Sequence, residues 1–67
     1  MHSLKIARVR AGMNLGELAR MSGVSANTIS AIEHGVREPQ AMTLLKLAMA
    51  LRVDPATLMQ EEEKTAV

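Results

Sequence analysis

Residues 14–35 read NLGELARMSGVSANTISAIEHG, and their pattern is the most informative part of the chain. Asn14 is a good N-cap, and the apolar residues that follow it at helical spacing predict a helix over about residues 15–22. Ser25 is a second N-cap, and it predicts another helix over about residues 26–34. The stretch therefore encodes two short helices that follow each other closely.

The turn between these helices contains only Gly23, Val24 and Ser25. Glycine is a common residue at the end of a helix, and Val24 supplies a hydrophobic residue inside the turn. Two short helices joined in this way form a helix-turn-helix arrangement, here over about residues 15–34.

One helix is predicted before this arrangement and two after it. Ser3 can cap a first helix that runs through Ala11, with apolar residues at helical spacing along it. Pro39 is well placed ahead of a helix over about residues 41–51. Asp54 and the proline after it are a strong start signal for a last helix to about Glu61.

Length and composition allow one small helical domain. The 67 residues have room for a single core, and with 0% aromatic content that core must be built from aliphatic side chains and methionine. We expect a compact all-α fold of five helices over residues 1–61, followed by an acidic tail, residues 62–67, that frays. Cysteine is absent and the only histidines are His2 and His34, so neither disulfides nor a metal site are expected.

The charge of the chain gives weak support for a nucleic-acid partner. The formal net charge is +1, and it is +3 over residues 1–59 because residues 60–67 carry three glutamates and one lysine. Four basic residues lie in the first third of the chain: Lys5, Arg8, Arg10 and Arg20. An ordinary solvated surface explains this distribution equally well.

Other broad classes are not expected. The apolar stretches are far shorter than the roughly 20 residues that span a membrane, and no signal sequence is visible, which favours a soluble cytoplasmic protein. No serine, histidine and acid are placed together for nucleophilic catalysis, and Glu61, Glu62 and Glu63 lie in the expected tail. An enzyme is therefore not expected, nor is a cofactor.

Several short motifs keep a common spacing along most of the chain. They are Glu17-Leu18-Ala19, Gly23-Val24-Ser25, Thr28-Ile29-Ser30, Ile32-Glu33, Gly35 and Pro39, continued by Leu44, Leu47-Ala48, Leu51, Val53-Asp54-Pro55 and Leu58. In this pattern the chain resembles the lambda-repressor and Cro family, the xenobiotic-response-element type of helix-turn-helix protein.

The resemblance implies a transcriptional regulator, most often a repressor, that binds a double-stranded DNA operator as a dimer with its third helix in the major groove. The residues presented to base edges would be Ala26, Asn27, Thr28, Ser30 and Ala31. Asn27 is the best reader, because its amide can both donate to and accept from adenine. The alternative is that Asn27 is only a solvated polar residue in the first helical turn.

Phosphate contacts are predicted at Asn14, Arg10, Arg20 and Arg37. The chain departs from the family at Leu15, where a glutamine commonly holds the DNA backbone. The resemblance also implies an ion pair between Arg8 and Glu33 that ties the first helix to the third. The alternative for Arg8 is a direct phosphate contact.

A second apolar stripe borders the core-facing side of the fourth helix. We predict a twofold dimer contact built from Met42, Leu45, Met49 and Met59, with Val53 beside them. The alternative is that these side chains complete the core of the monomer.

Three other functions remain compatible with the sequence. The same fold can serve as an antitoxin that also binds a toxin, or as a helical interaction module that has lost DNA binding. It can also be the N-terminal domain of a larger regulator that carries a sensor domain.

Overall fold

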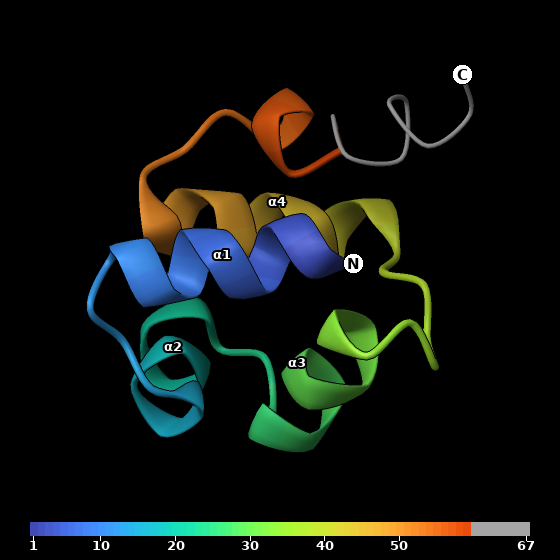
Figure 1. Ribbon diagram of the computed structural model, residues 1–67, viewed down its shortest axis with the longest axis horizontal. Helices are drawn as coiled ribbons and strands as arrows, with labels where there is room; N and C mark the ends of the chain where they lie inside the picture. The colour runs from blue at the N-terminus through green and yellow to red at the C-terminus, as the bar shows by residue number, and fades with distance from the viewer. Residues whose placement is uncertain (60–67) are drawn as a thin grey trace.

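The computed structural model describes residues 1–59, and these residues are helical without a strand. The helices are α1 (His2–Arg10), α2 (Leu15–Ser22), α3 (Ala26–Glu33) and α4 (Ala41–Leu51), and residues 55–59 form a fifth helical segment (Figure 1). The predicted all-α fold of five helices is confirmed. The predicted end of the last helix near Glu61, and the tail over residues 62–67, lie outside the described residues.

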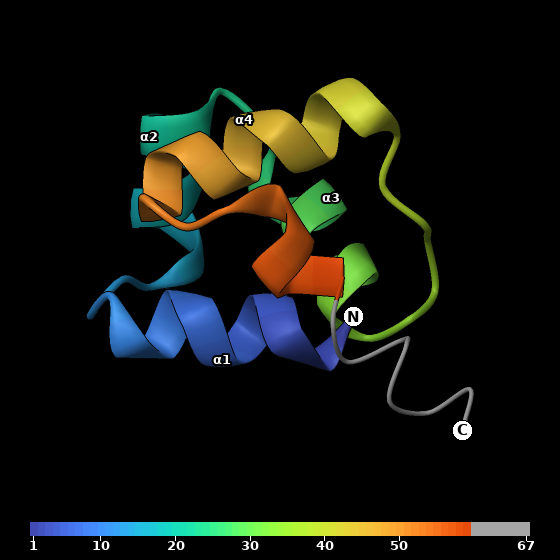
Figure 2. The same ribbon diagram turned by 90° about the horizontal axis from the view of Figure 1, so that it is seen from above.

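One aliphatic core joins all five helices. Its fully buried large side chains are Leu4, Leu18, Ile29, Ile32, Leu47 and Leu58. Each such side chain contributes roughly 1.5–3 kcal/mol by leaving water, so no helix is independent of the others. Within this bundle α2 packs on α3 and α4, and α1 packs on α3. Figure 2 shows the fifth helical segment between α1 and α4.

The helix-turn-helix segment forms through local capping, as predicted. The side-chain oxygen of Asn14 accepts a hydrogen bond from the backbone N–H of Glu17 at 2.8 Å, and the Glu17 carboxylate accepts one from the backbone N–H of Asn14 at 3.0 Å. Gly23 ends α2 in the left-handed conformation, and Val24 turns inward to join the core. Two caps and one buried residue therefore fix the angle between α2 and α3.

The prediction for the start of α1 is wrong. The helix begins at His2, with Met1 as its N-cap, so Ser3 lies inside the first turn. The hydroxyl of Ser3 donates instead to the backbone carbonyl of Leu58, which ties α1 to the fifth helical segment. Ala11 is exposed just beyond the end of α1, so the buried stripe of this helix is shorter than its periodicity suggested.

The end of α4 contains a backbone conformation that arginine seldom adopts. Arg52 has φ 57° and ψ 42°, the left-handed conformation, whereas the other positive-φ residues of the described chain are glycines. A side chain with a Cβ in this region costs roughly 1–2 kcal/mol relative to the right-handed one. Glycine avoids that cost.

We expect Arg52→Gly to raise the free energy of unfolding by about 0.5–1 kcal/mol, because the relief of strain exceeds the extra chain entropy of glycine. Urea denaturation followed by circular dichroism measures the change. Arg52→Ala is the control, since it removes the guanidinium but keeps the Cβ. If alanine stabilises as much as glycine, the gain comes from the lost charge and not from the backbone.

Candidate nucleic-acid interface

Helix α3 lies at the edge of the bundle with one face outward (Figure 1). Ile29 and Ile32 lie on its inner face and are fully buried. Asn27 is exposed in its first turn, whereas the other residues predicted to face DNA are half-buried: Ala26, Thr28, Ser30 and Ala31. Asn27 is thus the most accessible of the predicted reading residues.

A short polar network holds the first turn of α3. The Ser25 hydroxyl donates to Oγ1 of Thr28 at 2.8 Å and accepts from the Thr28 backbone N–H at 3.1 Å. An Nη atom of Arg37 lies at hydrogen-bond distance, 3.5 Å, from the same Thr28 oxygen. The loop after α3 therefore places the Arg37 side chain beside the first turn of the same helix.

A polar hollow of about 320 Å³ opens beside this network, between α3, the loop over residues 36–40 and α4. Thr28 and Arg37 line it together with four residues for which the sequence predicted no function: Glu38, Gln40, Thr43 and Lys46. Gln40 is the N-cap of α4 but makes no side-chain cap, and the first turn of α4 has no acidic residue. The hollow therefore combines two cationic side chains and the positive end of a helix with one carboxylate, that of Glu38.

Asn14 and Arg20 come together at the start of α2. A Cβ atom added at Gly16 would lie 3.4 Å from Oδ1 of Asn14 and 3.6 Å from an Nη atom of Arg20. The Arg20 side chain thus reaches back along the helix toward its amino end. Leu15, where the family commonly has glutamine, is half-buried and packs against the core. Arg10 is exposed in the last turn of α1, and within residues 1–59 no hydrogen bond joins it to Asn14 or Arg20.

Comparison with known proteins supports the resemblance seen in the sequence. A family described as helix-turn-helix matches residues 4–58. The chain belongs to the lambda-repressor-like helix-turn-helix family.

Two similar proteins are uncharacterised HTH-type transcriptional regulators from Mycobacterium tuberculosis, strains CDC 1551 and H37Rv. Each is 38% identical over 55 residues, which cover 82% of this chain. The chain spans only 39% of the length of these relatives. No solved structure matches closely enough to be compared.

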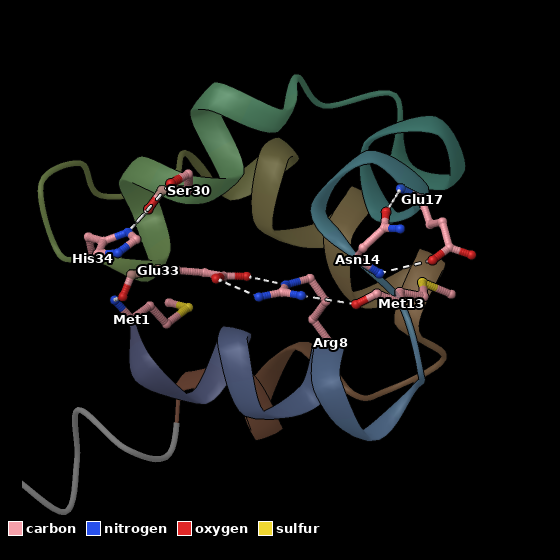
Figure 3. A network of polar contacts seen from close by, with 8 residues as sticks. All are labelled: Met1, Arg8, Met13, Asn14, Glu17, Ser30, Glu33 and His34. Atoms are coloured by element: carbon pink, nitrogen blue, oxygen red, sulfur yellow. Dashed lines mark hydrogen bonds and ion pairs between the residues drawn. The ribbon is translucent and has the colours of Figure 1, made fainter.

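In this lambda-repressor-like domain, Arg8 and Glu33 form a two-point ion pair between α1 and α3 (Figure 3). Nε of Arg8 lies 2.7 Å from Oε2 of Glu33, and Nη2 of Arg8 lies 3.1 Å from Oε1. The third nitrogen donates to the carbonyl of Met13 at 2.9 Å. The side chains are only 13% and 3% exposed. The hydrogen bonds that Arg8 donates to the Glu33 carboxylate raise the pKa of Arg8 above its ordinary value.

The carboxyl-terminal end of α3 also makes hydrogen bonds to residues beyond the helix, Met1 and His34. The amino group of Met1 donates to the backbone carbonyl of Ile32 and, as Figure 3 shows, to that of Glu33. Nδ1 of His34 lies 2.7 Å from the carbonyl of Ser30 and 3.4 Å from its hydroxyl, so the imidazole folds back beside Ser30. This contact holds the exposed imidazole of His34 beside the last turn of α3 in the helix-turn-helix domain.

The residues predicted to form a dimer contact fall into two groups. Met42, Leu45, Met49 and Met59 are exposed, so they do not complete the monomer core. Val53 is half-buried and packs against the core. Since Met42, Leu45 and Met49 are spaced by three and four residues on α4, they form one exposed apolar stripe.

The described residues lack a metal cluster and a membrane-spanning helix. Residues 1–59 contain no group of three histidine, cysteine or acidic side chains that could hold a metal ion. Over the same residues, no helix is both long enough and apolar enough to cross a membrane.

Proposed function

We propose that this cytoplasmic domain binds double-stranded DNA sequence-specifically and acts as a transcriptional repressor. One observation carries the proposal: the first turn of α3 exposes Asn27 and borders the polar hollow through Thr28, and a second group of hydrogen-bond donors lies at the start of α2. A helix in the major groove needs backbone contacts on both sides to fix its register. The relatives named as transcriptional regulators support the same function.

The two groups of donors suit phosphate oxygens. At the start of α2, the Asn14 cap uses the oxygen of the side-chain amide, and the amide nitrogen can donate to a phosphate beside Arg20. At the hollow, Arg37 and Lys46 supply positive charge, and Thr43 supplies a hydroxyl. In this arrangement Arg20 and Arg37 replace the glutamine contact that Leu15 cannot make.

Sequence is then read by short side chains. Asn27 can pair with the N6 and N7 atoms of adenine, and Ala26 and Ala31 can contact a thymine methyl group. Thr28 is already engaged by Ser25 and Arg37, which makes it a positioning residue more than a reader.

Selection of bound duplexes from a random pool tests this proposal, and Asn27→Ala is the informative variant. We expect it to lose about 1–3 kcal/mol of discrimination at one or two base pairs while other positions keep their preference. Lys46→Gln is the contrast, because it should weaken all sequences alike and reduce the salt dependence by about one unit of slope. Failure of the unmodified protein to enrich any sequence would overturn the proposal.

We propose further that two copies associate through the exposed stripe of α4, centred on Leu45 and extended by Met59. Such a pair would present two α3 helices to half-sites about 34 Å apart.

Leu45→Asp should raise the dissociation constant of the dimer at least about tenfold, because it buries a carboxylate in an apolar contact. Sedimentation equilibrium measures the change. Ile6→Asp is a matched control, since Ile6 on α1 is 39% exposed and Leu45 is 41% exposed. Equal effects of both variants would contradict an interface at α4.

A further inference from the structure

A shallow groove of about 390 Å³ lies between the carboxyl-terminal ends of α2 and α4. Its lining consists of Met21, Ser22, Lys46, Met49, Ala50 and Arg52. The two methionine side chains are 63% and 70% exposed, which is unusual for large apolar residues that lie beside each other. The DNA contacts proposed above use neither methionine, although they do use Lys46, and Met49 also belongs to the α4 stripe proposed for the dimer.

The charged residues of this groove have one sign. Lys46 and Arg52 line it, and none of its lining residues is acidic. Apolar side chains between two cations form a surface that suits an apolar stripe flanked by carboxylates.

Arg52 is placed there at a cost in backbone conformation. The other left-handed positions of the described chain are Gly12, Gly23 and Gly35, so the end of α4 is the exception. A glycine at this position would end α4 equally well, but it would remove one of the two cations from the groove.

We propose that this groove docks an acidic amphipathic helix of a partner protein. Apolar side chains of that helix would cover Met21 and Met49, and its carboxylates would pair with Lys46 and Arg52. A second copy of this chain, docked on the same groove, would bring the same two cations against each other. DNA offers charge to Arg52 but no apolar surface for the methionines. The proposal does not depend on DNA binding.

Methionine-methyl NMR of the full chain provides a direct test, because the six methionines are spread over the molecule. The probe is a synthetic helical peptide with leucines along one face and glutamates on both flanks, and the matched peptide has lysines in place of the glutamates. We expect the acidic peptide to shift the methyl signals of Met21 and Met49 in a saturable way. The signal of Met13 should not move, and the basic peptide should have no effect.

Arg52→Gly separates docking from folding, since this variant is expected to be more stable than the natural chain. The variant should bind the acidic peptide about fivefold more weakly, which is the effect of losing one exposed ion pair. Three results would overturn the proposal: equal binding of the two peptides, unchanged affinity in Arg52→Gly, or shifts at Met42 and Met59 in place of Met21. A loss of DNA affinity in Arg52→Gly, with no effect on peptide binding, would assign this cation to the DNA backbone instead.

Discussion

Glu33→Ala is expected to lower the free energy of unfolding by about 3 kcal/mol, the cost of leaving a buried charge without its partner. The guanidinium of Arg8, only 13% exposed, would keep a single protein acceptor, the carbonyl of Met13. A core of this size supplies only a few kcal/mol of net stability, so a large share of the molecules should unfold. Thermal and urea denaturation followed by circular dichroism measure the loss.

The double variant Arg8→Met with Glu33→Leu is the matched control. It fills a similar volume with apolar groups, and we expect it to recover most of the stability. If the double variant is as unstable as Glu33→Ala alone, the loss arises from packing and not from the stranded charge.

The ion pair should contribute equally throughout the neutral range of pH. The hydrogen bond that Arg8 donates to Glu33 raises the pKa of Arg8 above its ordinary value. A raised pKa means that the stabilisation is fully present below that value and is lost only as the pH rises beyond it. The difference in the free energy of unfolding between the natural chain and Glu33→Ala should therefore stay constant from neutral to moderately alkaline pH.

The parts of the fold that the sequence predicted are those decided by neighbours in the chain. The Asn14 cap, the Gly23 stop and the Ser25 cap each act within a few residues, and α2 has the predicted bounds. Helix α4 also matches, because its apolar face is continuous over residues 41–51.

The contacts that could not be predicted from the residue pattern join segments that are far apart in the sequence. The sequence predicts Ser3 as a local helix cap, yet its hydroxyl donates a hydrogen bond to a backbone carbonyl 55 residues away. The pair of Arg8 and Glu33, 25 residues apart, was suggested only by family resemblance. Nothing local marks Lys46 as a neighbour of Arg37, because that proximity exists only after α4 packs on the helix-turn-helix segment.

Thr28→Asp is expected to weaken DNA binding strongly while the domain stays folded. Position 28 lies in the first turn of α3, where no acidic residue is present and where the helix dipole favours a carboxylate. The new carboxylate could accept from the Ser25 hydroxyl and pair with Arg37, so stability should be unchanged or rise by about 0.5 kcal/mol. The same negative charge would face the phosphates and withdraw Arg37 from them, which should reduce DNA affinity about 100-fold.

Fluorescence anisotropy with a selected duplex measures the affinity, and urea denaturation measures stability in the same buffer. Thr28→Ser is the control, because it keeps the hydroxyl that Ser25 and Arg37 contact. Its affinity should remain within a few-fold of the natural chain. If the aspartate variant is folded and binds DNA normally, the first turn of α3 does not approach the duplex, and α3 is not the reading helix.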